Sequence, residues 1–171
     1  MIYFTSDLHF NHNRESIYES RGFVNVWDMN KEIVDNWNSK VKDNDIVYVL
    51  GDLMLGNNEK GKKFLTQLKG DLHIILGNHD TEARIEIYKN LYNTVDVKYA
   101  DRIKYGKYIF YLSHYPSKVT NKKDKPIWCL HGHTHSKNKF EYPQNYNVSL
   151  DAHNMKLVSI EEVIHDIERK R

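Results

Sequence analysis

The chain contains 171 residues, of which 40% are hydrophobic and 28% are charged. These proportions are ordinary for a folded protein and exclude a disordered chain, which carries fewer apolar residues and more unbalanced charge. The 25 basic and 23 acidic residues leave a formal net charge of +2, which is too small to predict an extended surface for nucleic acid or membranes. The length predicts one domain over residues 1–171.

The sequence lacks the features of an exported or membrane-bound protein. Its single cysteine, Cys129, cannot form an intramolecular disulfide and lies in an apolar run that predicts a buried thiol. The first residues turn polar too soon for a signal peptide, and no stretch approaches the ~20 apolar residues of a membrane helix. We therefore expect a cytoplasmic protein with no membrane partner.

The first half of the chain alternates between strand-like and helix-like patterns. Buried-strand runs occupy residues 1–5, 45–50 and 72–76. Helical patterns are expected after Asp28 as N-cap, before Gly70, and after Asp80 or Thr81. Short connections between such elements predict right-handed crossovers and a largely parallel sheet, in which the second and third strands are neighbours.

The second half predicts a further sheet packed on the first. Residues 94–113 hold two strand-like runs on either side of Gly106, and shorter runs cover residues 127–131, 145–151 and 156–159. The last helix is expected to begin at Ser159, with Glu162 completing a capping box and an apolar stripe facing a sheet.

Polar clusters follow five of the predicted strands at the point where each strand ends. They are Asp7-Leu8-His9, Gly51-Asp52, Gly77-Asn78-His79-Asp80, Ser113-His114 and Gly132-His133-Thr134-His135. Ligand sites in α/β sheets gather at the carboxyl ends of strands, so we expect these clusters to converge. Asp, Asn and His suit divalent Mn, Fe, Zn, Co or Ni, and Asp52 on its glycine turn is well placed to bridge two ions through its two oxygens.

The order of these clusters resembles the calcineurin-like metallophosphoesterase superfamily, whose pattern runs D-x-H, G-D, G-N-H-[D/E], H and G-H-x-H. The resemblance spans Asp7 to His135 and is closest to short bacterial and phage-type members. It implies an α/β fold, a four-layer α/β/β/α sandwich of two packed mixed sheets flanked by helices. It also implies two divalent metal ions, one held by Asp7, His9, Asp52 and His135, the other by Asp52, Asn78, His114 and His133.

The resemblance further implies hydrolysis of a phosphate ester by a hydroxide that bridges the two ions. In the family, the histidine matching His79 is not a ligand and stabilises the transition state or protonates the leaving oxygen. We expect Asp80 to fix the tautomer and orientation of His79, and so include both among the catalytic residues.

Residues near these clusters provide candidates for substrate contact. His12 and Arg14 lie in a polar loop after the first cluster, and Tyr115 directly follows His114. His12 is equally compatible with an ordinary solvated loop, whereas a solvated surface is favoured for Arg14. Tyr115 could stack on a nucleobase, but most tyrosines serve in packing. Arg21 and the basic run of Lys118, Lys122, Lys123 and Lys125 favour a solvated surface over a phosphate-binding one.

We expect a phosphodiesterase of nucleotides or nucleic-acid ends, because compact members of the family often act on such diesters and no long insertion forms a cap. The first alternative is a phosphomonoesterase acting on phosphoproteins or small metabolites. An alternative of another class is a non-catalytic binding scaffold of the same fold, against which the intact set of ligands argues.

Overall fold

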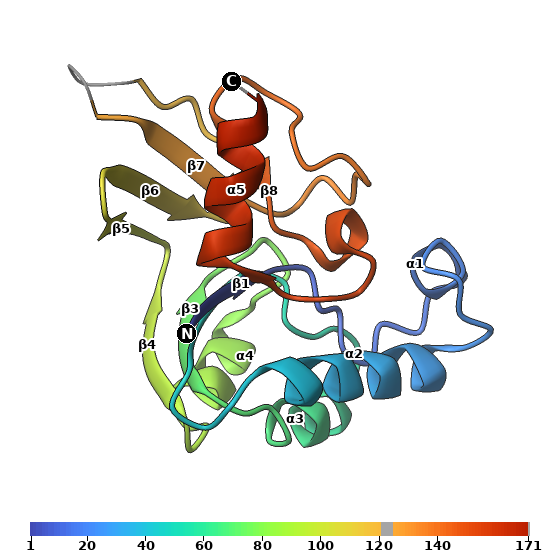
Figure 1. The fold of residues 1–171 in the computed structure, drawn as a ribbon. Coiled ribbons are helices and arrows are strands. Elements are labelled where there is room, and N and C mark those ends of the chain that lie inside the picture. The colour runs from blue at the N-terminus through green and yellow to red at the C-terminus, as the bar shows by residue number, and fades with distance from the viewer. Residues whose placement is uncertain (121–124, 171) are drawn as a thin grey trace.

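The computed structural model describes residues 1–120 and 125–170, so Lys122 and Lys123 lie outside the described residues. The described chain forms two mixed sheets with flanking helices, as predicted (Figure 1). None of the helices in these two ranges is long and apolar enough to span a membrane.

The first sheet has the strand order β4-β3-β2-β1-β9. Its strands are β1 (Ile2–Thr5), β2 (Ile46–Leu50), β3 (Asp71–Ile75), β4 (Thr94–Lys98) and β9 (Val158–Ser159). The first four pair in parallel and β9 pairs antiparallel with β1, which confirms the largely parallel sheet and the pairing of β2 with β3. Parallel strands end at the same edge, so the loops after β1, β2 and β3 emerge together.

Three helices cover one face of this sheet: α2 (Val26–Lys40), α3 (Asn58–Leu65) and α4 (Glu82–Lys89). A short helix, α1 (Glu15–Tyr18), precedes them in the loop after β1. Alternate strand residues such as Val47, Val49 and Ile74 point toward the helices and form a buried apolar layer with them.

The start of α2 differs from the prediction. Asn25, not Asp28, is the N-cap, and its side-chain oxygen accepts a hydrogen bond from the Asp28 backbone N–H at 2.9 Å. Asp28 instead occupies the first turn, where its negative charge favours the positive end of the helix dipole. Both residue types suit the cap, and Asn25 lies the required three positions before the amide it binds.

The second sheet has the order β5-β6-β7-β8. It contains β5 (Ala100–Tyr105), β6 (Tyr108–Ser113), β7 (Ile127–His131) and β8 (Asn145–Asn147). Residues 94–113 therefore contain three strands instead of the two that were predicted, because β4 ends at Lys98 and belongs to the first sheet. The run expected over residues 145–151 is also shorter, since a 3₁₀ turn, η1 (Leu150–His153), follows β8.

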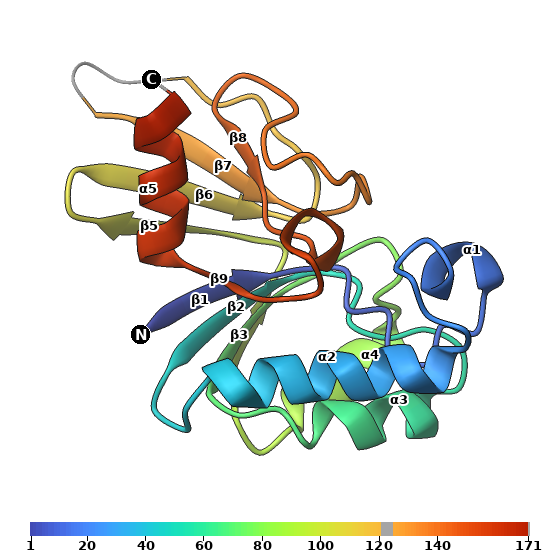
Figure 2. The ribbon, with the colours of Figure 1, turned by 45° about the vertical axis from the view of Figure 1, so that its right-hand side comes forward.

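A second apolar layer lies between the sheets and includes Phe4, Leu50, Phe110 and Leu130. The last helix, α5 (Ile160–Lys170), adds three buried residues, Ile160, Val163 and Ile167, to the same layer (Figure 2). Its capping box is confirmed, because the Ser159 backbone N–H donates to Glu162 at 2.7 Å and the Glu162 N–H donates to Ser159 Oγ at 3.2 Å.

Candidate active site

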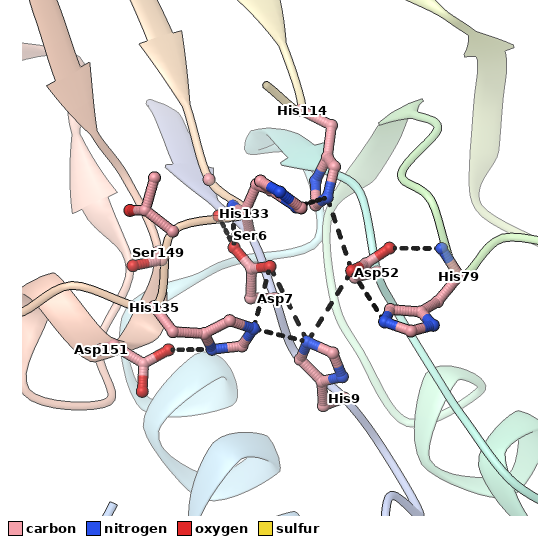
Figure 3. Close-up of polar contacts among 12 residues, drawn as sticks. Ser6, Asp7, His9, Asp52, His79, His114, His133, His135, Ser149 and Asp151 are labelled. Atoms are coloured by element: carbon pink, nitrogen blue, oxygen red, sulfur yellow. Dashed lines mark hydrogen bonds and ion pairs between the residues drawn. The ribbon is translucent and has the colours of Figure 1, made fainter. Parts of the chain in front are cut away.

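The loops that follow β1, β2, β3, β6 and β7 bring their polar side chains to one edge of the molecule (Figure 3). The seven residues expected to bind metal all lie there, within hydrogen-bonding or ion-pairing distance of at least one other member of the set. They divide into two groups that share Asp52, and these are named the first and second clusters below.

The first cluster consists of Asp7, His9, Asp52 and His135. Asp7 Oδ1 lies 3.8 Å from His9 Nε2 and 3.7 Å from His135 Nε2. The two Nε2 atoms are 3.2 Å apart, and Asp52 Oδ2 is 3.9 Å from His9 Nε2. The nitrogen and oxygen atoms therefore face one point, and the ligand atoms of Asp7, His9 and His135 are close enough together to hold one ion.

The second cluster consists of Asp52, Asn78, His114 and His133. His114 Nε2 lies 3.4 Å from Asp52 Oδ2 and 2.9 Å from Asn78 Oδ1. His133 Nδ1 is 3.0 Å from the same Asn78 oxygen and 3.2 Å from His114 Nε2. These donor atoms converge in the same way as those of the first cluster.

Asp52 faces both clusters through a single oxygen. Its Oδ2 atom approaches His9 on one side and His114 on the other, whereas Oδ1 accepts a hydrogen bond from the His79 backbone N–H at 2.9 Å. This differs from the predicted arrangement, in which the two oxygens point to separate ions. The backbone of His79 occupies the second oxygen instead, and this fixes the direction of the first.

The surroundings of Asp7 fit a divalent cation. Its Oδ2 atom accepts from Ser6 Oγ at 2.6 Å and from the His133 backbone N–H at 2.9 Å. Its Oδ1 atom is buried and has no hydrogen-bond partner among the described residues. A buried carboxylate oxygen without a partner is costly, and a cation among Asp7, His9 and His135 would remove that cost.

Burial and charge act against each other at these residues. Burial would raise the pKa of Asp7, but the neighbouring imidazoles of His9 and His135 hold it well below its usual range. At Asp52 burial is likewise outweighed by His114, so its pKa is lowered. Burial would lower the pKa of His114, and its interactions with Asp52 and Asp7 raise it instead. The two carboxyl groups therefore favour their ionised form despite burial.

Left-handed backbone conformations gather at the site. Five of the seven expected ligands have positive φ angles, namely 56° at Asp7, 51° at His9, 56° at Asp52, 69° at His133 and 51° at His135. Such angles are uncommon for residues with a Cβ atom and cost free energy that the rest of the fold must offset. Their concentration at one edge makes it the candidate functional region of the molecule.

His79 faces the clusters but lies outside both. Its Nε2 atom is 4.0 Å from Asp52 Oδ2, and its ring centroid lies 5.7 Å from that of His9. The side chain is 42% exposed, whereas that of His114 is 1% exposed. The His79 side chain is therefore far more open to solvent than that of His114.

Asp80 does not orient His79, contrary to our expectation. Its Oδ2 atom accepts from the backbone N–H groups of Asp52 at 2.9 Å and Gly77 at 2.8 Å, and its Oδ1 atom accepts from Tyr88 Oη at 2.7 Å. Burial, followed by the charge of Asp80, raises the pKa of Tyr88 and keeps that hydroxyl protonated. Asp80 therefore holds the turns after β2 and β3 together, and it acts on Asp52 through the backbone.

The three candidates for substrate contact occupy different positions. His12 stacks on His9 with its Nδ1 atom 3.2 Å from His9 Nδ1, and burial with the charge of His9 lowers its pKa to about 4. The Tyr115 ring is 49% exposed and lies 4.5 Å from the ring of His133. Arg14 is exposed at the N-cap of α1, and within the described residues no hydrogen bond or ion pair connects it to the clusters.

Asp151 and Arg21 support the first cluster, although no sequence motif pairs them. Asp151 Oδ2 lies 3.0 Å from His135 Nδ1, and Arg21 binds both Asp151 oxygens at 3.0 and 2.8 Å. Arg21 also donates to the Asp7 carbonyl at 2.7 Å, and its side chain is only 1% exposed. Arg21 is therefore a buried structural residue, not the solvated one that we expected. A carboxylate behind a histidine commonly fixes which ring nitrogen faces a metal.

Comparison with known proteins identifies the family. The family model of the calcineurin-like phosphoesterases matches residues 1–166. The chain belongs to the calcineurin-like phosphoesterase family. It is a hydrolase of phosphate esters in a family that depends on divalent metals. Within the two clusters, Asp7, His9 and His135 form one candidate metal-ligand group, and Asp7, Asp52 and His114 form another.

Relatives of this phosphoesterase match it over nearly their whole length. An uncharacterized protein of Methanocaldococcus jannaschii is 38% identical over 98% of this chain and 92% of its own. The Gene 66 protein of Mycobacterium phage D29 is 28% identical over 98% of this chain and 97% of its own. Among solved structures, a protein of unknown function from Aquifex aeolicus has a TM-score of 0.74 and 25% identity, covering 96% of this chain and 98% of that one.

We predict that Asp151→Ala weakens metal binding by roughly 10- to 100-fold, because His135 loses the partner of its Nδ1 atom. Titration of the full chain with Mn²⁺ by calorimetry measures the change. Asp96→Ala is the matched control, since Asp96 also pairs with a histidine, His73, at 3.0 Å but outside both clusters. Equal Mn²⁺ affinity in the two variants would contradict the role of Asp151.

We also predict that Gly132→Ala loses most metal affinity, because the added Cβ would collide with Ser6 Oγ and Asp7 Oδ2. The same Mn²⁺ titration, with a thermal melt, separates this effect from unfolding. Gly22→Ala serves as control, since a Cβ at Gly22 meets no atom within 4 Å although its φ of 87° makes the substitution strained. Normal Mn²⁺ binding by Gly132→Ala would show that Asp7 tolerates the displacement.

Proposed function

We propose that this protein is a binuclear metal-dependent phosphodiesterase that acts on nucleotides or nucleic-acid ends. The observation that carries the proposal is the position of Asp52 Oδ2, which lies 3.9 Å from His9 Nε2 in the first cluster and 3.4 Å from His114 Nε2 in the second. One carboxylate oxygen between two converging sets of ligands suits a pair of ions that share a ligand.

In this proposal Asp7, His9, Asp52 and His135 hold one ion, and Asp52, Asn78, His114 and His133 hold the other. Mn²⁺ is the ion that we favour for assays among the divalent metals that nitrogen and oxygen ligands accept. When bound, the ions supply Lewis acidity that lowers the pKa of water and offsets the negative charge of the phosphoryl oxygens.

The protein's own residues position these groups. Ser6 and the His133 backbone hold one oxygen of Asp7, and the His79 backbone holds one oxygen of Asp52, so both carboxylates are oriented before a substrate arrives. Asp151 orients His135 in the same way. The imidazole of His79 is partly exposed and lies 4.0 Å from Asp52, and in this proposal it donates a proton from Nε2 to the leaving oxygen.

The preference for a diester is supported by the openness of the site. A diester carries a substituent on each side of phosphorus, so it needs space on both sides. The side chains of His79 and His135 are 42% and 33% exposed, and Tyr115 beyond His133 is 49% exposed. These exposed rings leave room for a second substituent, whereas a monoester requires none.

Removal of metal is expected to abolish hydrolysis, and addition of Mn²⁺ or Ni²⁺ to restore it. The test compares bis(p-nitrophenyl) phosphate with p-nitrophenyl phosphate, followed by a panel of cyclic nucleotides, dinucleotides and nucleic-acid ends. A higher kcat/KM for the diester supports the proposal, and a higher value for the monoester assigns a phosphomonoesterase. If neither ester is hydrolysed with any of the metals, the protein is assigned as a non-catalytic binding scaffold.

His79→Ala is expected to lower kcat by about 100-fold or more while Mn²⁺ affinity stays unchanged, because proton transfer is lost and the ligands remain. Asp52→Asn is expected to lose both kcat and Mn²⁺ affinity. His165→Ala is the matched control, since the His165 side chain is 68% exposed on α5. Full kcat in His79→Ala would remove that residue from the reaction.

A further inference from the structure

A groove runs along the helical side of the molecule, next to the loop that carries His12. It lies between α2 and α3, which are side by side in both ribbon views (Figures 1 and 2). It encloses about 780 Å³, a volume within the range of sites that bind nucleotide-sized ligands. Its lining includes Asn11, Asn13, Trp27, Lys60, Lys63 and Phe64.

An exposed tryptophan forms part of the groove wall. Trp27 is 66% exposed, whereas the other two tryptophans, Trp37 and Trp128, are 0% and 6% exposed. The edge of its ring meets Phe64 at 5.3 Å between centroids, and Phe64 in turn stacks on Phe10 at 5.4 Å. The indole is thus held by the core on one side and presents an open surface to the groove.

The charge of the groove is positive. Lys60 and Lys63 project from α3 into it, and neither has an ion-pair partner among the residues that the structure describes. Lys31 across the groove is paired with Asp35, so these two charges offset each other. Two uncompensated ammonium groups beside an exposed indole suit a ligand with phosphates and an aromatic base.

One end of the groove lies next to the loop that carries His12, which contacts the first cluster. Asn11 and Asn13 line its end, and His12 between them stacks on His9 of the first cluster at 5.1 Å between centroids. Asn11 also donates to the carbonyl of Asn57, the N-cap of α3, at 3.3 Å. A strand lying in the groove would therefore lead toward the place where phosphate is expected to bind.

We propose that this groove binds a single-stranded segment of a nucleic-acid substrate, with a base stacked on Trp27 and backbone phosphates beside Lys60 and Lys63. The inference rests on the proposed phosphodiesterase function and extends it by assigning a polymer substrate. Stacking on an aromatic ring and contact of lysines with phosphates are the two main sources of affinity for single strands. The segment would hold the chain while its end lies at the two clusters.

Binding of a fluorescein-labelled ten-nucleotide oligothymidylate to the full chain tests the proposal. Anisotropy is measured in a chelator, so that no hydrolysis occurs. Trp27→Ala is expected to raise Kd roughly 5- to 100-fold, and Trp27→Phe to raise it less, because a phenyl ring still stacks. Quenching of tryptophan fluorescence by the oligonucleotide should accompany binding in the wild type and disappear in Trp27→Ala.

Charge reversal provides a second and independent test. Lys60→Glu and Lys63→Glu are expected to weaken binding and to reduce the dependence of log Kd on log salt by ~0.7 for each phosphate that the protein no longer neutralises. Lys62→Glu is the matched control, because Lys62 lies on the same exposed helix without lining the groove. It should change Kd less than twofold.

Hydrolysis of bis(p-nitrophenyl) phosphate separates this proposal from the proposed function, since that small ester does not reach the groove. The groove variants should retain the wild-type rate. Loss of oligonucleotide affinity in the Trp27 and Lys60 variants supports the groove even if the wild type hydrolyses nothing. The proposal is overturned if the wild-type protein fails to bind the oligonucleotide at about 100 µM. It is also overturned if the groove variants bind the oligonucleotide as tightly as Lys62→Glu does. A groove that binds a protein partner would give either of these results.

Discussion

The buried carboxylate of Asp7 directly links the loops of the two sheets. It follows β1 of the first sheet, yet its Oδ2 atom accepts a hydrogen bond from the backbone N–H of His133, which follows β7 of the second sheet. Gly132 allows this approach, because any side chain there would meet Ser6 and Asp7. This hydrogen bond therefore couples the geometry of the first cluster to the relative position of the sheets, which also pack on each other through the apolar layer between them.

A second group of contacts fixes the candidate site from behind. Asp80 ties the loops after β2 and β3 through backbone amides, and the Arg21–Asp151 pair ties His135 to the Asp7 carbonyl. Asp80 acts on Asp52 and Asp151 acts on His135, although neither Asp80 nor Asp151 belongs to a cluster. Orientation of this kind reduces the reorganisation needed when charge develops during a reaction.

Much of this arrangement could be predicted from local sequence. The five polar blocks lie at strand ends, and strand ends in a parallel sheet share an edge, so the convergence of Asp7, Asp52 and Asn78 follows from the strand pattern. The Arg21–Asp151 pair could not be found in this way, because 130 positions separate its members and neither belongs to a motif. The division between β4 and β5 was missed for a related reason, since the chain changes sheets within an unbroken strand-like run.

The left-handed backbone at Asp7, His9, Asp52, His133 and His135 has a consequence for redesigning the site. Asn, Asp, His and Gly tolerate this conformation, whereas β-branched and bulky residues do so poorly. Exchange of one ligand type for another is therefore open at these positions as far as the backbone is concerned, while apolar replacement would distort the chain as well as remove a ligand. The backbone conformation of these loops therefore limits the types of side chain that could be used to change the metal specificity.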